Sequence, residues 1–188
     1  RYNVLESRCS NKVSITNSKY YFVARDCNRL KRAKFSYVAD CIFDHCGDDV
    51  VSCHGDIENS NHIFCNNVVK VSLGPAYLGG KYIDIHDNTF INPVLLFKSG
   101  LSGGEGGITE VVNFHHNKVI DPIRVPGMTD KKLTMLGEGT RKIYINNNVF
   151  KEGDTQILET FVFVGRVYTN QEVLKGHYLI STSNSSYE

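Results

Sequence analysis

The chain has 188 residues, of which 41% are hydrophobic and 22% charged, and its formal net charge at pH 7 is +1. This composition is that of an ordinary globular domain, and without a basic block it gives no reason to expect a nucleic-acid partner. No apolar run approaches the roughly 18 residues of a membrane span, and the N-terminus lacks both a starting Met and the apolar stretch of a signal peptide. We therefore expect one domain over residues 1–188 that does not contact a membrane. The domain is either a whole protein or a piece of a longer chain.

Cysteines are confined to the first third of the chain. They stand at positions 9, 27, 41, 46, 53 and 65. None forms a C-x-x-C pair, so a zinc site of the usual spacing is not indicated. The favoured interpretation is that they are small buried hydrophobic residues of the core, and the alternative is one or more disulfides.

A short pattern recurs along the chain, most clearly in YIDIHDNTFINP, VVNFHHNKVIDP and RKIYINNNVFKEG. In each copy apolar residues alternate with polar ones, which is the period of a β-strand. One polar residue, the anchor, interrupts the apolar side before the alternation resumes. The anchors stand at Ser18, Asp40, Asn67, Asn88, Asn117, Asn148 and, more weakly, Ser183.

Repeats of about 20 to 35 residues built from short strands are typical of solenoids. An Asn at the same point of successive coils can donate to one neighbour and accept from the other, and it tolerates a left-handed bend. The pattern predicts an all-β fold, a parallel β-helix of about six to seven coils with an asparagine ladder. Loops should project from the coils, including the Gly-rich segment 98–110 and the segment 121–140. An antiparallel sandwich is the alternative.

This coil pattern resembles the right-handed parallel β-helix proteins of the pectin-lyase-like group, over nearly the whole chain. The resemblance implies a right-handed coil. Because the group includes proteins of different activity, the fold alone does not give a function.

In a solenoid, residues at equal distance from their anchors should share a column on one face. The column expected here contains Asp26, Asp48, Asp49, Tyr77, Lys98 and Arg124. Two carboxyl groups astride a glycosidic bond can act as acid and base, and crowding of carboxylates raises the pKa of at least one. A Tyr can stack on a sugar ring, while Lys and Arg can hold acidic sugars. The column therefore predicts a site that binds and cuts a sugar polymer.

The stretch FDHCGDDVVSCHG is similar to the polygalacturonase family of pectin-degrading hydrolases. Gly47, Asp48 and Asp49 match its G-D-D motif, and Asp26 stands about one coil earlier. The resemblance implies that Asp48 or Asp49 is the general acid, that the remaining pair activates water, and that His54 contacts substrate. The sequence departs from the family in the residues before Asp26, in the position of His54 within the same coil, and in lacking R-I-K downstream.

We expect a hydrolase of acidic or bacterial surface glycan, needing no metal or other cofactor. The fold also resembles phage tailspikes, which implies a homotrimer located at the virion surface or outside the cell. One alternative is a lyase of the same fold, using Lys98 or Arg124 as base and calcium held by oxygen ligands. Another is a structural rod that binds glycan without cleaving it.

Two other polar groups are candidate metal sites. The first either supports the acidic coil from behind or holds calcium through oxygen ligands in the lyase, and it comprises Asp44, His45, His54, Asp56 and Glu58. The second is a column of His86 and His115, next to Asp87 and His116. Stacking of turn residues on the outside of the rod is the favoured interpretation of this column, and metal binding is the alternative.

Overall fold

The structure is a computed structural model that describes residues 4–54, 60–100, 108–123, 134–136, 139–153, 155–156 and 178–181. Within these ranges the chain forms β-strands and turns, which confirms the all-β expectation. Over the same ranges no helix has the length and apolar character that would let it cross a bilayer. Arg124 and Ser183 lie outside the described residues.

The strands form three sheets, in which every third strand of the chain is a neighbour. Sheet A contains β1 (Leu5–Arg8), β4 (Asn28–Lys31), β7 (Val51–His54), β10 (Ala76–Tyr77), β13 (Phe97–Ser99) and β16 (Thr134–Leu136). Sheet B contains β2 (Val13–Thr16), β5 (Phe35–Ala39), β8 (Asn61–Cys65), β11 (Gly80–His86), β14 (Thr109–His115), β17 (Thr140–Asn146) and β20 (Tyr178–Ser181). Sheet C contains β3 (Lys19–Val23), β6 (Ile42–Cys46), β9 (Val68–Lys70), β12 (Thr89–Ile91), β15 (Lys118–Ile120), β18 (Val149–Glu152) and β19 (Thr155–Gln156).

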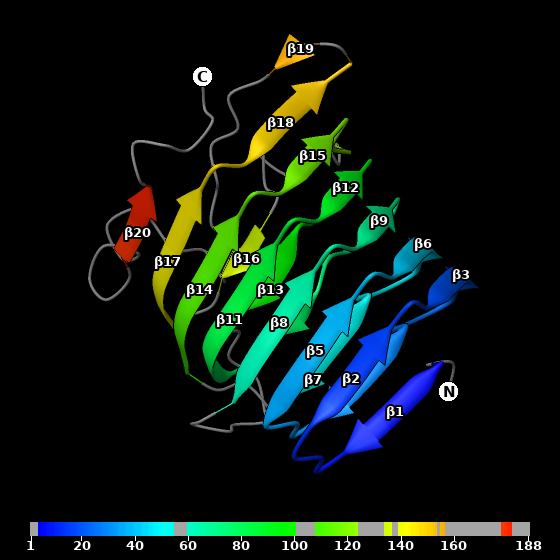
Figure 1. The fold of residues 1–188 in the computed structure, drawn as a ribbon, viewed down its shortest axis with the longest axis vertical. Helices are drawn as coiled ribbons and strands as arrows, with labels where there is room; N and C mark the ends of the chain where they lie inside the picture. The colour runs from blue at the N-terminus through cyan, green and yellow to red at the C-terminus, as the bar shows by residue number, and fades with distance from the viewer. Residues whose placement is uncertain are drawn as a thin grey trace.

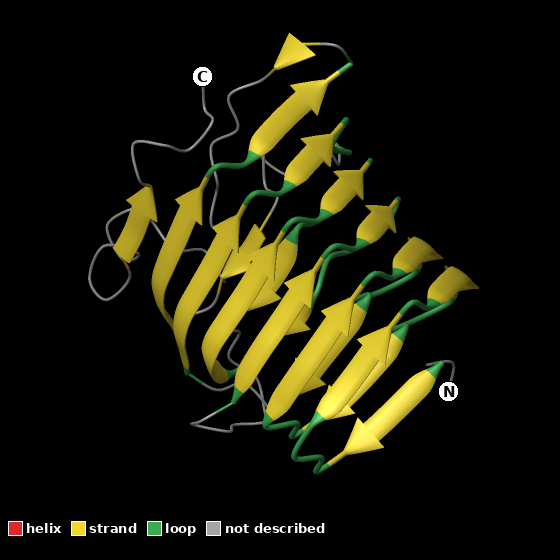
Figure 2. Ribbon diagram, viewed as in Figure 1, coloured by secondary structure: helices red, strands yellow, loops and turns green. Residues whose placement is uncertain are grey.

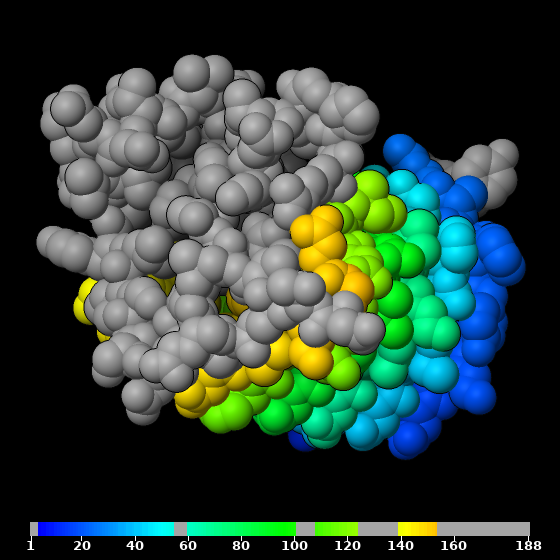
Figure 3. Space-filling model, turned by 90° about the horizontal axis from the view of Figure 1, so that it is seen from above, coloured from blue at the N-terminus to red at the C-terminus, as the bar shows by residue number. Residues whose placement is uncertain are grey.

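The chain visits the three sheets in turn and then starts again one strand further along (Figures 1 and 2). Among the described strands the pairing is parallel, apart from the short antiparallel contact of β18 with β19. Seen from above, the colours follow in bands from blue to yellow across the stack (Figure 3). The arrangement is consistent with a parallel β-helix solenoid and excludes the antiparallel sandwich.

Aromatic side chains fill the space between the sheets. The fully buried phenylalanines that point inward from sheets B and C include Phe43, Phe64, Phe90, Phe114 and Phe150. The ring centroids of Phe43 and Phe64 are 6.0 Å apart, and those of Phe90 and Phe114 are 6.1 Å apart. Each ring removed from water contributes about 1.5–3 kcal/mol, so these rings are a main source of cohesion between coils.

Buried asparagines link the coils at the corner between sheets B and C. Asn67 Nδ2 donates to Asn88 Oδ1 at 3.1 Å, Asn88 Nδ2 donates to Asn117 Oδ1 at 3.0 Å, and Asn117 Nδ2 donates to Asn148 Oδ1 at 3.1 Å. The backbone N–H of each of the first three donates to the same acceptor. The bend interrupts the strand ladder, and these amides satisfy the polar groups left there.

The anchor at position 40 needs correction by one residue. The N–H of Cys41 donates to Asn67 Oδ1 at 3.0 Å, so Cys41 occupies the anchor position. Asp40 has a φ of 58°, and Asn66, the residue before the next anchor, has a φ of 55°. Asp and Asn both tolerate this left-handed conformation, so the residue type alone did not distinguish the anchor from its predecessor.

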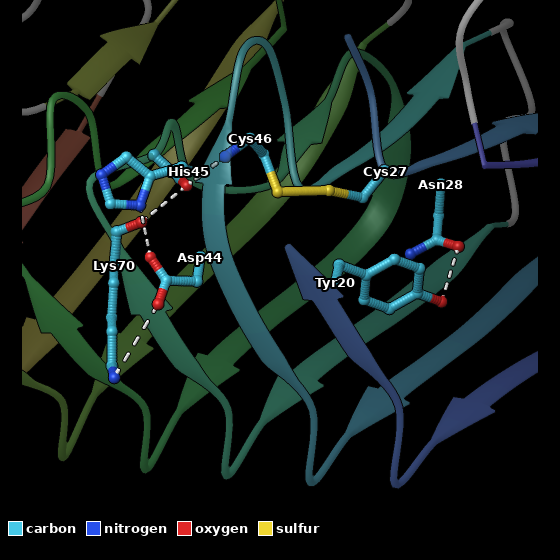
Figure 4. The surroundings of a disulfide bond; sticks show 8 residues. Tyr20, Cys27, Asn28, Asp44, His45, Cys46 and Lys70 are labelled. Atoms are coloured by element: carbon cyan, nitrogen blue, oxygen red, sulfur yellow. Dashed lines mark hydrogen bonds and ion pairs between the residues drawn. A yellow bond between two sulfur atoms is a disulfide. The ribbon is translucent and has the colours of Figure 1, made fainter. Parts of the chain in front are cut away.

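Cys27 and Cys46 form a disulfide across 19 residues, with their Cα atoms 6.5 Å apart (Figure 4). The disulfide alternative therefore holds for this pair. The buried-residue interpretation fits Cys41, Cys53 and Cys65, whereas Cys9 is exposed.

Candidate active site at the Asp26 and Asp48–Asp49 turns

The three candidate carboxylates lie in turns that lead into neighbouring strands of sheet A. Asp26 precedes β4, and Asp48 and Asp49 precede β7. The N–H of Cys27 donates to the carbonyl of Asp49 at 3.0 Å, so the turns stack in the register of the strands that follow. The Cys27–Cys46 disulfide crosslinks the same two turns beside the carboxylates.

The structure brings all three carboxyl groups together. One oxygen from each lies within 4.8 Å of the others. Asp26 Oδ2 accepts a hydrogen bond from Ser52 Oγ at 2.9 Å, which ties the turn before β4 to strand β7. Lys98 Nζ lies 2.7 Å from Asp49 Oδ1 and 3.6 Å from Asp48 Oδ1.

Burial differs sharply within the group. Asp26 and Asp49 are 8% and 6% exposed, whereas 45% of the Asp48 side chain is accessible. Burial raises the pKa of Asp49 to about 7; Lys98 opposes this rise, and Asp48 and Asp26 add to it. At neutral pH, Asp49 is therefore a carboxyl group that can donate a proton, and Asp48 connects the group to solvent.

Lys98 reaches the carboxylates from two strands away. It belongs to β13, and the register of sheet A aligns it with Ala76 of β10 and Ser52 of β7. The small Ala76 side chain leaves room for Lys98 to extend back over β10. The column expected from the sequence places Lys98 beside Tyr77. In the structure Tyr77 is the register partner of Ser99, so the expected alignment is wrong by one residue.

That one-residue difference removes Tyr77 from the site. A shift of one position along a strand moves a side chain to the opposite face. Tyr77 is fully buried, its ring stacks on His62 with centroids 4.8 Å apart, and it belongs to the hydrophobic core. Its ring does not face solvent, which argues against the expected stacking on a sugar.

His54 is distant from the carboxylates. It ends β7 beside Lys31 of β4, five residues after Asp49, which corresponds to roughly 16 Å along an extended strand. The structure thus does not bring it to the acidic turns, and it does not describe Arg124.

Two residues that sequence reasoning missed share the face of Lys98. Ser52 contacts Asp26, and Arg29 is its register partner in β4. The Nε of Arg29 is buried and has no hydrogen-bond partner among the described residues. Both could have been found from the strand register, because each occupies the outward position in its strand.

The same three carboxylates are also a candidate metal site, and the position of Lys98 bears on it. Three carboxylates could hold a cation, but the Lys98 ammonium already lies against Asp48 and Asp49. In the calcium group considered from sequence, Asp44 contacts His45 and Lys70 (Figure 4). Positions 56 and 58 of that group lie outside the described residues.

The chain was compared with protein-family models, curated proteins and solved structures, and none of the three comparisons found a match. The function of the chain is therefore inferred from the geometry of the site.

Proposed function

We propose that the chain is a right-handed parallel β-helix that hydrolyses an acidic polysaccharide at Asp26, Asp48 and Asp49. The observation that carries this proposal is the contrast within the group. A buried carboxyl with a pKa of about 7, Asp49, lies within 4.8 Å of a solvent-accessible one, Asp48. A protonated and an ionised carboxyl side by side are what glycoside hydrolysis requires.

The environments suggest separate roles. Asp49 donates its proton to the leaving glycosidic oxygen, because burial keeps part of it protonated at neutral pH. Asp48 faces solvent and attacks the sugar, while the carboxylate of Asp26, which accepts a hydrogen bond from Ser52 Oγ, adds negative charge beside the developing cation. Carboxyl groups about 5 Å apart favour direct attack, whereas a separation of about 6.5–9.5 Å is needed for an intervening water.

The cationic residues suggest an acidic substrate. Lys98 and Arg29 lie on the same face of sheet A as the carboxylates. Arg29 is partly exposed, so its guanidinium could pair with the carboxylate of a uronate or sialate. We extend the proposal, by the resemblance to tailspikes, to bacterial surface glycan and to a homotrimer located at the virion surface or outside the cell. No cofactor is required.

A lyase is less well supported. Its base would have to be Lys98, but the Nζ of Lys98 already lies 2.7 Å from Asp49 Oδ1 and 3.6 Å from Asp48 Oδ1, where it acts as the ion-pair partner of these groups. The low exposure of Asp26 and Asp49 favours, as second candidate, a rod that binds glycan without cleaving it.

The test is incubation of the protein with acidic polysaccharides of bacterial and plant origin, followed by sizing of the products. We expect cleavage by the wild type, a loss of about 10²–10⁴-fold in Asp49→Asn, and a comparable loss in the double variant Asp48→Asn/Asp49→Asn. Asp44→Asn is the matched control, because its carboxylate lies on sheet C. Cleavage at the parent rate in a folded double variant would overturn the catalytic assignment. An unsaturated product absorbing in the ultraviolet would identify a lyase instead.

A further inference from the structure

Strands β11 and β14 are neighbours in sheet B (Figure 1). A cluster of imidazoles lies where these two strands end. His86 and His115 are register partners, and their rings stack with centroids 5.1 Å apart and planes inclined by 7°. His116 meets His115 edge-on, at 5.0 Å between centroids and 84° between planes. The cluster is separate from the acidic turns, which precede strands of sheet A.

Backbone conformation brings the two adjacent imidazoles together. His115 is the last residue of β14, and His116 has a φ of 53°, the left-handed value of the residue before each buried Asn. Neighbouring residues of a regular strand point to opposite faces, but this bend turns the His116 side chain back toward His115. Their Nδ1 atoms are 2.7 Å apart.

The outer nitrogens of both rings have partners that fix the rings. His115 Nε2 lies 3.0 Å from Asp84 Oδ1, and His116 Nε2 lies 3.3 Å from Asn147 Nδ2. A consistent proton assignment has His115 donating from Nε2 to Asp84 and His116 accepting at Nε2 from the Asn147 amide. His116 then donates its Nδ1 proton to the Nδ1 lone pair of His115, so a single proton joins the two rings.

We propose that these two Nδ1 atoms form a chelating site for a divalent transition-metal ion of the Cu²⁺ or Ni²⁺ class. Imidazole nitrogen is a preferred ligand of these ions. On binding, the shared proton moves from His116 Nδ1 to His116 Nε2, the Asn147 amide turns over to accept it through Oδ1, and water completes the coordination. Asp84 is the carboxylate that orients His115 from its far side, an arrangement typical of histidine ligands.

The separation of the two nitrogens selects the geometry of the ion. With metal–nitrogen bonds of about 2.0–2.1 Å, adjacent ligands are about 2.8–3.0 Å apart at right angles but about 3.4 Å apart in a tetrahedron. The observed 2.7 Å fits the right-angle arrangement. We therefore infer a square-planar or octahedral ion rather than tetrahedral zinc.

The neighbouring coil provides an internal comparison. At the equivalent positions His86 Nδ1 pairs with Asp87 Oδ2 at 2.8 Å, so that coil offers one imidazole and one carboxylate. Only the coil with consecutive histidines, among those described, presents two imidazole nitrogens to one point.

The test is calorimetric titration of the purified chain with Ni²⁺, repeated in two buffers of different ionisation enthalpy. We expect one site and little net proton release at slightly alkaline pH, because binding moves the shared proton within His116 instead of losing it to solvent, so the heats in the two buffers should nearly agree. His116→Asn keeps a residue suited to the left-handed conformation, since Asn147 adopts it in the next coil with a φ of 52°. This variant should weaken binding by about tenfold or more, and Asp84→Asn by about tenfold.

His86→Gln is the matched control, because it removes the stacked ring but neither chelating nitrogen, and it should leave the affinity within about twofold of wild type. A Cu²⁺ electron paramagnetic resonance spectrum of a Cys9→Ser chain should show nitrogen ligands that are lost in His116→Asn. Absence of Ni²⁺ binding, or equal affinity in wild type and His116→Asn, would overturn the proposal. This inference does not depend on the proposed hydrolase activity.

Discussion

Lys98 and Asp49 form an ion pair of 2.7 Å between a side chain of β13 and a turn that precedes β7, two strands away in sheet A. The pair spans the intermediate strand β10 above Ala76. Burial raises the pKa of Asp49, and a residue about 50 positions later in the chain, Lys98, opposes that rise.

Replacement of Lys98 by Met should raise the pKa of Asp49 above its present value of about 7, because the ammonium is the main influence that lowers it. Carbon-13 NMR titration of the Asp carboxyls would measure the shift, and in an active protein the alkaline limb of the pH–rate profile should move upward with it. Lys70→Met is the control, since that Lys lies near Asp44 instead. An unchanged Asp49 titration in Lys98→Met would show that the ion pair does not persist in solution.

The raised pKa of Asp49 also predicts how stability depends on pH. Below about pH 4 the carboxyl is protonated in both folded and unfolded chains, so it has no effect on their difference. Between about pH 4 and 7 the unfolded chain loses this proton first, so stability falls as pH rises and levels off above the folded pKa. A shift from 3.8 to about 7 corresponds to about 4 kcal/mol at about 1.4 kcal/mol per pKa unit.

Asp49→Asn removes this titration. The variant should therefore be more stable relative to wild type at pH 8 than at pH 4.5. The difference in the free energy of unfolding should be on the order of a few kcal/mol. Urea denaturation at the two pH values measures the difference. An equal effect of the substitution at both values would contradict the raised pKa.

The periodic residues of the chain were sufficient to predict the β-fold and its parallel strands. Alternation of apolar residues around Asn88, Asn117 and Asn148 identifies the strands, and buried amides then hydrogen-bond from coil to coil. The repeat is easy to recognise in the sequence because each of these coils uses an Asn side chain to hydrogen-bond the polar groups at the same bend. It weakens at Asp40, where the anchor is a Cys that has no distinctive pattern of its own.

The carboxylates of the site were predicted because few residues separate them from their anchors, so an anchor error of one position at Asp40 did not matter. Asp26 and Asp49 follow their corners closely, and the structure brings them together. Tyr77 follows a longer connection after Asn67, where a one-residue difference in register exchanges inside for outside. Lys98 extends over β10 to Asp49 because its side chain is long and that of Ala76 is small. A prediction based only on the positions of Cα atoms includes neither of these properties.

Asn88→Ala should destabilise the fold strongly. Asn88 Oδ1 accepts from both the N–H and the amide of Asn67, and Asn88 Nδ2 donates to the carbonyl of Phe64. Each buried partner left unsatisfied costs about 1–3 kcal/mol, so the total loss is on the order of several kcal/mol. Asn113→Ala, whose amide makes only long contacts on the outer surface, is the control for thermal or urea unfolding. Equal midpoints for the two variants would contradict the structural role of Asn88.

The carboxyl separation predicts the stereochemistry of the proposed hydrolysis. Oxygens within 4.8 Å of one another favour direct attack on the sugar, which retains the anomeric configuration after two displacements. Proton NMR of the first product formed from a cleaved polysaccharide would show the configuration before mutarotation. Inversion would mean that a water molecule enters between the carboxyls and that Asp48 acts as a base.

Gly47→Ala should disturb the acidic turns directly. A Cβ at this position would lie 2.5 Å from the carbonyl oxygen of Ala24 and 3.0 Å from its carbonyl carbon, both of which are backbone atoms of the turn that carries Asp26. The N–H of Gly47 also donates to the carbonyl of Val23 at 2.7 Å, so the two turns can separate only by breaking this bond. Overpacking of this kind costs about 1–3 kcal/mol.

The displacement in Gly47→Ala would move Asp48 and Asp49 away from Asp26. We therefore expect a lower unfolding midpoint together with a fall in any glycan cleavage that exceeds the loss of folded protein, measured as the rate per folded molecule. Cleavage and stability that both remain at the wild-type level would show that the turns are not packed as closely as the structure describes. A fall in stability with unchanged cleavage per folded molecule would instead show that cleavage does not depend on the close packing of these turns.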